Sequence, residues 1–141
     1  MQIHLISDIH VDRGFDYRLI KNTNSDVLVL AGDIGSSPMQ SSNVLRYFAD
    51  IFPHVVFVFG NHEFYSYDVD QAKDDLKKTV QDLPNVHILD RQSVNIDDVI
   101  FIGATLWSNF KNGDPAVMWE SSRYINDFQY IRKNGNRFTV S

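Results

Sequence analysis

The sequence contains no cysteine among its 141 residues. Disulfide bridges, thiolate metal sites and cysteine nucleophiles are therefore excluded, and any bound metal must be held by oxygen and imidazole nitrogen. Long hydrophobic runs are also absent. The run Val55–Phe59 is among the longest, whereas a membrane-spanning helix needs about 20 apolar residues. The first residues, MQIHLISD, include no basic region, so we expect no signal peptide and a cytoplasmic protein.

Positive charge is in short supply. The chain carries 13 Lys and Arg against 18 Asp and Glu, for a formal net charge of −5, which argues against strong general affinity for nucleic acid. A phosphate-bearing substrate remains compatible, because bound cations can reverse the sign of the charge within a site. Both glycine-rich fingerprints of nucleotide-binding folds are missing: G-x-G-x-x-G after the first expected strand, and G-x-x-x-x-G-K-[ST] anywhere.

The sequence alternates between apolar and amphipathic segments. Nearly continuous apolar runs predict strands buried on both faces, at residues 1–7, 26–32, 54–60 and 85–90. Between the later strands, apolar residues recur at helical spacing, which predicts helices within 38–52 and 68–83. We therefore expect an α/β fold, in which a mostly parallel, layered sheet carries helices on both faces. The length suits one domain over residues 1–141, and no repeat or linker marks a boundary.

Local signals refine these elements. Pro38 after Ser37 favours a helix start, and Asp68 is a suitable N-cap for the next helix. Residues 93–107 lack room for a helix between two apolar runs, which predicts a hairpin that turns at Asp97 and Asp98. Further on, DPAVMWESSRYI (114–125) predicts a short helix, with an aspartate as its cap and a proline at its first position.

Polar residues gather where three expected strands end. The first ends in SDIH, the second in AGDIG and the third in GNHE. In an open α/β sheet, ligands bind beyond the carboxyl ends of the strands, so we expect Asp8, His10, Asp33, Asn61 and His62 to meet at one edge. Carboxylate, imidazole and amide groups suit manganese, iron, zinc or magnesium.

Each of these residues also has an ordinary structural interpretation. Asp8 can cap a helix, and Asp33 and Asn61 can form turns beside glycine; their joint occurrence at three strand ends favours a metal site. A phosphoaspartyl enzyme could use either aspartate, but would leave the histidines unexplained. Glu63 has two interpretations, a partner that orients a histidine or an exposed cap. The remaining histidines, 4, 54 and 87, lie away from this edge and are expected to pack or face solvent.

The motifs DIH, GDIG and GNHE, in this order, resemble those of the calcineurin-like metallophosphoesterases, an αββα fold. The resemblance continues through GATLWSNF and INDFQYIRKNGNRFTV and so covers essentially the whole chain. It implies that Asp8 and His10 bind one divalent metal ion, that Asp33 bridges two, and that Asn61 binds the second. It further implies hydrolysis of phosphate mono- or diesters by a metal-bridging hydroxide, with His62 facing the phosphate to stabilise or protonate the leaving oxygen.

The sequence departs from the family pattern after its midpoint. The family also needs a Gly-His and then a Gly-His-x-His, yet the chain contains no Gly-His dipeptide, and His87 is its last histidine. The first metal would keep Asp8, His10 and Asp33, and the second only Asp33 and Asn61. The alternative hypothesis is therefore a truncated, catalytically impaired module that binds a phosphate ligand or a partner chain. We also expect self-association through the aromatic-rich segment 105–141, because the sheet would otherwise leave an uncovered edge and face.

Overall fold

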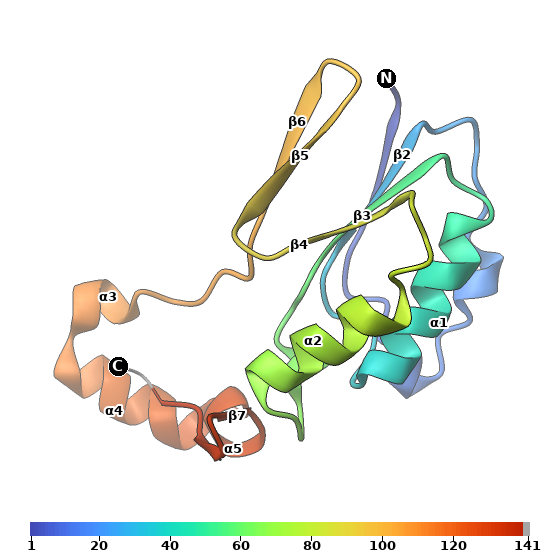
Figure 1. Ribbon diagram of the computed structural model, residues 1–141. Helices are drawn as coiled ribbons and strands as arrows, with labels where there is room; N and C mark the ends of the chain where they lie inside the picture. The colour runs from blue at the N-terminus through green and yellow to red at the C-terminus, as the bar shows by residue number, and fades with distance from the viewer. Residues whose placement is uncertain (140–141) are drawn as a thin grey trace.

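The computed structural model describes residues 1–139 and centres on a parallel sheet of four strands (Figure 1). The strands lie side by side in the order of the sequence: β1 (Ile3–Ile6), β2 (Val27–Ala31), β3 (His54–Val58) and β4 (Val86–Leu89). Their register aligns Ile3 with Val27 and Val27 with His54. All four predicted strands are thus confirmed, and their carboxyl ends lie at one edge of the sheet.

Two helices connect the strands. α1 (Pro38–Ala49) begins where the side chain of Ser37 accepts a hydrogen bond from the backbone N–H of Gln40, and α2 (Val69–Thr79) begins where Asp68 accepts one from Asp70. The predicted helix start at Pro38 and the predicted cap at Asp68 are confirmed. The helices lie next to each other, and Arg46 at the end of α1 pairs with Asp82 beyond α2 through two contacts of 2.8 Å.

The main core fills the space between these helices and the sheet. Its largest fully buried side chains come from both layers, and include Leu28, Leu45, Phe48, Phe57 and Leu76. Burying a side chain of this size stabilises a fold by about 1.5–3 kcal/mol relative to leaving it exposed. The apolar stripes that predicted the helices therefore also fix how the helices dock.

A β-hairpin covers part of the opposite face of the sheet. Strands β5 (Gln92–Ile96) and β6 (Val99–Gly103) pair antiparallel on either side of a turn at Asp97 and Asp98, as the sequence predicts. Ile96 of the hairpin packs with Val27 and Val56 of the sheet in a second, smaller core. The approach is close, since a Cβ atom at Gly103 would stand 2.6 Å from Cβ of Leu89.

The placement of the helices differs from the expectation of helices on both faces. α1 and α2 both contribute to the core on one face, and the hairpin packs on the other. The strand order explains this, because right-handed crossovers that always step to the next strand in the same direction place every connecting helix on one side. The α/β class and the parallel sheet are as predicted.

The remainder of the described chain is irregular. It contains α3 (Phe110–Gly113), α4 (Pro115–Tyr124), α5 (Asp127–Tyr130) and a short pair of strands, β7 (Arg132–Lys133) and β8 (Asn136–Arg137). Asp114 caps α4 by accepting hydrogen bonds from Ala116 and Val117, as predicted. Three 3₁₀ turns occur earlier in the chain: η1 (Val11–Arg13), η2 (Tyr17–Leu19) and η3 (His62–Phe64).

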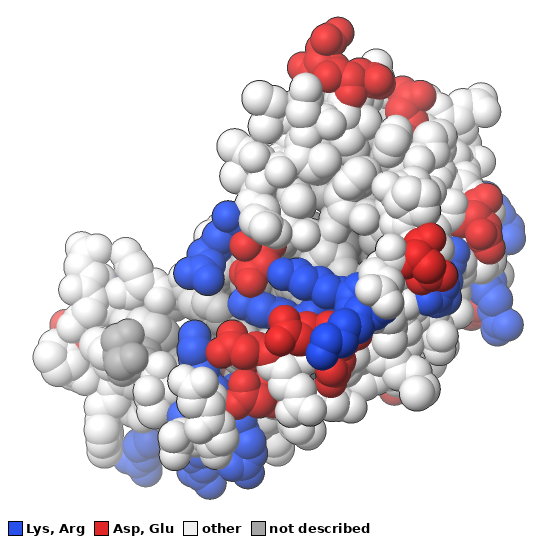
Figure 2. Space-filling view, in the orientation of Figure 1, with Lys and Arg blue, Asp and Glu red and all other residues white. Residues whose placement is uncertain are grey.

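The C-terminal segment is fastened near the start of α2 (Figure 1). The backbone N–H of Arg132 donates to the carbonyl of Tyr67, and that of Ser66 donates to the carbonyl of Tyr130. Figure 2 shows charges of both signs mixed over α2, whereas the hairpin is mostly uncharged apart from acidic groups at its turn. Within residues 1–139, no helix is long and apolar enough to cross a membrane.

Candidate metal centre

The loops at the carboxyl ends of β1 and β2 carry unusual backbone geometry. Asp8, His10 and Asp33 have φ angles of 55°, 43° and 55°, in the left-handed region that non-glycine residues seldom adopt. Hydrogen bonds hold the two loops together: Asp8 N donates to Gly32 O and His10 N to Asp33 O, both at 3.1 Å. Such strain persists only where the surroundings enforce it, and it is concentrated at functional sites.

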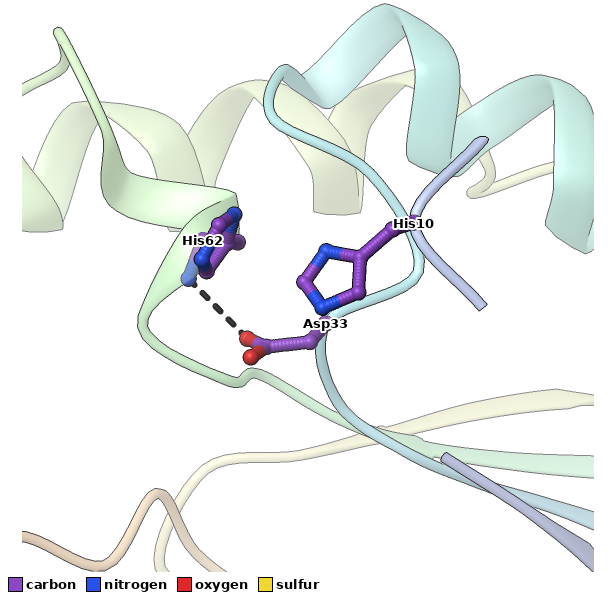
Figure 3. Close-up of side chains that lie close together, drawn as sticks. All are labelled: His10, Asp33 and His62. Atoms are coloured by element: carbon purple, nitrogen blue, oxygen red, sulfur yellow. Dashed lines mark hydrogen bonds between the residues drawn. The ribbon is translucent and has the colours of Figure 1, made fainter. Parts of the chain in front are cut away.

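His10, Asp33 and His62 form the tightest cluster of potential ligands. One ligand atom from each lies within 4.8 Å of the others. The two imidazole rings meet edge to face, with centroids 4.4 Å apart. The backbone N–H of His62 donates to Oδ1 of Asp33 at 3.0 Å, which holds the carboxylate beside the two rings (Figure 3). Three different strand ends thus supply one cluster. Its third member, His62, is predicted to face the phosphate and not the metal, and the predicted ligands Asp8 and Asn61 are not members of it.

Two buried nitrogen atoms in this cluster are chemically incomplete. Nδ1 of His10 and Nδ1 of His62 are both inaccessible to solvent, and neither has a hydrogen-bond partner among residues 1–139. Buried polar atoms in proteins are almost always partnered. Nδ1 of His10 lies 3.9 Å from Oδ1 of Asp12, whereas Nε2 lies 4.0 Å from Oδ1 of Asp8. The imidazole and carboxylate groups of this cluster fit a divalent cation of borderline softness.

Asp8 and Asn61 approach the same carboxylate from a neighbouring cavity. Oδ1 of Asp8 lies 4.0 Å from Nε2 of His10, and the Asp8 side chain is largely exposed. Asp8, Asp33 and Asn61 together line a cavity of about 530 Å³, which Trp107 and Phe128 also line. Asp33 therefore belongs both to the histidine cluster and to the cavity, and it is the residue for which a bridging position is predicted.

Asn61 makes contacts that the sequence pattern does not reveal. Its Nδ2 donates to Oδ1 of Asp127 at 2.7 Å and to Oη of Tyr65 at 3.1 Å, and Tyr65 Oη also donates to Asp127 at 2.9 Å. Burial, and then the hydrogen bond to Asp127, raise the pKa of Tyr65 well above its usual range. Asp127 is 8% exposed and lies 66 residues from Asn61 in the sequence. No local motif therefore predicts the contact between them.

Glu63 has neither of the two roles that the sequence suggests. It is 2% exposed, and its carboxylate accepts four backbone N–H groups. Oε2 accepts from Asp33 (3.0 Å) and Gly60 (2.7 Å), and Oε1 accepts from Ile34 (2.7 Å) and Gly35 (3.2 Å). Burial raises the pKa of Glu63 to about 7, and the N–H donors oppose that rise. One side chain therefore joins the loop after β2 to the loop after β3.

A second hollow borders the histidine cluster on another side. It has a volume of about 490 Å³, and its lining includes His62, Arg13, Ser36 and Tyr65. The ring of Tyr65 stacks on the ring of His62, with centroids 4.4 Å apart and planes inclined by 28°. His62 thus stands between the cluster and a hollow that offers one cationic side chain and several hydroxyl groups.

The other histidines lie on strands, as expected. His54 and His87 occupy β3 and β4, with Nδ1 of the first 3.5 Å from Nε2 of the second. Burial, with a smaller contribution from His54, lowers the pKa of His87. These residues pack against each other at the opposite end of their strands from the candidate site.

Comparisons with known proteins show the family and the fold. The sequence profile described as Calcineurin-like phosphoesterase matches residues 1–137. An uncharacterised protein of Acanthamoeba polyphaga mimivirus is 34% identical over 117 residues, which cover 77% of this chain and 40% of the viral protein. The crystal structure of the phosphopantetheinyl hydrolase from Mycobacterium tuberculosis superimposes with a TM-score of 0.70 at 16% identity, and the match covers 97% of this chain and 57% of that one. The chain thus spans about half the length of these similar proteins.

Proposed function

Since this chain belongs to the calcineurin-like phosphoesterase family, whose members are hydrolases of phosphoester bonds, we propose that it is a metal-dependent hydrolase of phosphate mono- or diesters. The proximity of His10, Asp33 and His62, whose ligand atoms lie within 4.8 Å of one another, carries this proposal. Asp8 and Asn61 at the rim of the adjoining cavity complete the predicted set.

The residues present fit divalent ions, because imidazole and carboxylate groups bring ligand atoms within 4.8 Å of one another. Asp8, His10 and Asp33 would hold a first ion, and Asp33 and Asn61 a second; manganese, iron, zinc and magnesium all suit these donors. When bound, the ions would supply positive charge that polarises the phosphoryl oxygens and lowers the pKa of water. The lining of the cavity includes no Lys or Arg. Neutralisation of the negative charge of a phosphate bound there would therefore depend on these ions.

His62 is proposed to donate a proton to the leaving oxygen. Its backbone is held by Asp33, and its ring is held by stacking on Tyr65. General acid assistance is typically worth about 10²–10⁴-fold in rate. His62 is itself one of the three residues of the cluster, so direct metal binding is the competing role of its side chain.

The test of this assignment uses metal content and turnover together. Asp33→Asn should lose more manganese after equal dialysis than any other single variant, because Asp33 is proposed to contact both ions. His62→Ala should retain the metal and lose turnover of an aryl phosphate. Asp74→Asn, an exposed carboxylate on α2, is the matched control. A folded Asp33→Asn protein with unchanged metal content would refute the site, and loss of metal from His62→Ala would make His62 a ligand.

A second candidate function follows from the ligand count. Only Asp33 and Asn61 are available for the second ion among the predicted ligands, and two protein ligands seldom hold a divalent ion tightly. The chain would then bind one metal and a phosphate group with little turnover. Calorimetric titration with manganese, followed by inorganic phosphate, separates this outcome from catalysis with two bound ions.

A further inference from the structure

The Asn61 side chain is held by a buried acid from a distant part of the chain. Nδ2 of Asn61 donates to Oδ1 of Asp127 at 2.7 Å, while Tyr65 Oη donates to the same oxygen at 2.9 Å. Asp127 begins α5 and is 8% exposed. A carboxylate buried to this degree needs hydrogen-bond donors, and the amide and the phenol supply them.

This contact decides which end of the Asn61 amide faces the cavity. An ionised carboxylate only accepts hydrogen bonds, so the NH₂ group must point toward Asp127. The carbonyl oxygen Oδ1 then points away from Asp127, and no hydrogen bond to it is found among residues 1–139. Asn61, Asp127 and Asp33 line the same cavity, so the free Oδ1 is available to a cation there.

On this basis we propose that Asp127 is a positioning residue, which fixes the Asn61 amide so that its oxygen, rather than its nitrogen, is presented to the second metal ion. Tyr65 supports the arrangement by hydrogen-bonding to both partners. The proposal rests on the proposed metal-dependent function. It also explains why a segment beyond the sheet contributes a buried acid to the site, although that acid belongs to none of the motifs at the strand ends.

The competing role is direct coordination, because Asp127 lines the cavity too. The two roles differ in what a neutral replacement does. The side-chain oxygen of Asp127→Asn can still accept from Asn61 and Tyr65, but its NH₂ group can also donate to Oδ1 of Asn61, so positioning would be preserved in part. A carboxylate ligand would instead lose its charge. Asp127→Asn therefore separates the roles even if Asp127→Ala does not fold.

The first arm of the experiment measures manganese binding by calorimetry. Partners that orient metal ligands typically contribute about 10–100-fold in affinity, so Asp127→Ala should weaken the second manganese by about that factor. Asp127→Asn should recover part of the loss. In an Asn61→Ala background, Asp127→Ala should have no further effect, because the group that it orients is gone. Asp74→Ala is the control for loss of a remote carboxylate.

The second arm needs no metal or activity. In metal-free protein, NMR should show one Asn61 side-chain amide proton shifted downfield and protected from exchange, and Asp127→Ala should abolish both features. Unaltered amide signals in that variant would overturn the proposal. So would additive losses in the double variant, or failure of Asp127→Asn to restore binding. Wild-type protein that binds no manganese would refute the proposed function, and the amide signals would then decide the orientation alone.

Discussion

Two glycines at the strand ends allow the backbone loops of the candidate site to approach each other, and their substitution is a sharp test of the structure. A Cβ atom at Gly60 would stand 2.6 Å from the backbone nitrogen of Asp33, and would collide with the Asp33 carboxylate. A Cβ atom at Gly32 would stand 2.6 Å from the backbone nitrogen of Gly60. Neither neighbour is the end of a flexible side chain, so the loops themselves must move.

The two positions differ in backbone conformation, which allows two effects to be separated. Gly32 has a φ angle of +87°, whereas Gly60 lies outside the left-handed region. Gly14 provides the matched control, since its φ angle is +94° but a Cβ atom there would meet nothing within 4 Å. Gly14→Ala therefore measures conformational strain alone, Gly60→Ala measures crowding alone, and Gly32→Ala measures both.

The expected loss of unfolding free energy for each variant follows from whether strain, crowding or both act at its position. A left-handed conformation costs a non-glycine residue about 1–2 kcal/mol, and forcing extra atoms into a packed region costs about 1–3 kcal/mol. We expect losses of about 1–2 kcal/mol for Gly14→Ala, about 1–3 for Gly60→Ala and about 2–5 for Gly32→Ala. Urea unfolding in the presence of EDTA would measure all three free energies.

Metal binding adds an independent measurement. Gly60→Ala should displace the Asp33 carboxylate and weaken manganese binding, whereas Gly14→Ala should leave it unchanged. A Gly60→Ala protein with wild-type stability and wild-type metal affinity would show that the two loops are not in close contact. Equal losses for Gly14→Ala and Gly32→Ala would show that crowding contributes nothing.

Three further predictions concern other parts of the molecule. Because burial lowers the pKa of His87 in the folded state, the unfolded chain takes up more protons there, so the contribution of His87 to stability should fall as the pH drops below about 6.5. The raised pKa of Glu63 acts in the opposite direction over the same range, so the test compares two proteins: between pH 7.5 and pH 5.5, the unfolding free energy of His87→Gln in urea should shift upward relative to that of the wild type. Arg13 lines the hollow beside His62 and not the cavity; if the substrate phosphate occupies that hollow, Arg13→Ala should raise KM for an aryl phosphate about 10-fold with little change in kcat, whereas an effect no larger than that of Arg18→Ala would place the phosphate in the cavity. Self-association through residues 105–141 stays a prediction; residues 140 and 141 lie outside the described residues. The exposed side chains of Trp119 (60%) and Tyr124 (76%) support it. Trp119→Ser should weaken the association in sedimentation equilibrium, and a monomeric wild type at micromolar concentration would count against it.

The sequence was sufficient for features that depend on local patterns. Continuous apolar runs predicted the four strands, and the caps at Ser37, Asp68 and Asp114 are where local chemistry places them. The rule that ligands bind at the carboxyl ends of strands predicts one shared edge of the sheet for Asp8, His10, Asp33, Asn61 and His62. Their individual roles at a metal stay predictions.

The features that were missed depend on contacts between distant segments. The sequence suggests that Glu63 either orients a histidine or is an exposed cap, and its burial arises only when the loops after β2 and β3 converge on it. Asp127 lies in an irregular segment whose docking on Asn61 follows no periodicity. The single-sided placement of α1 and α2 depends on strand order, which hydrophobic patterns do not encode.

The four N–H groups gathered by Glu63 have a consequence for how the chain would acquire its metal. Because a carboxylate from within the protein ties the loops after β2 and β3 together, the entropy of ordering the ligands is lost during folding rather than on binding. The site is preorganised, in contrast to zinc fingers, in which the metal itself drives folding. Chelation should therefore empty the centre without unfolding the sheet, and reloading should be limited by entry of the ion rather than by refolding of the chain.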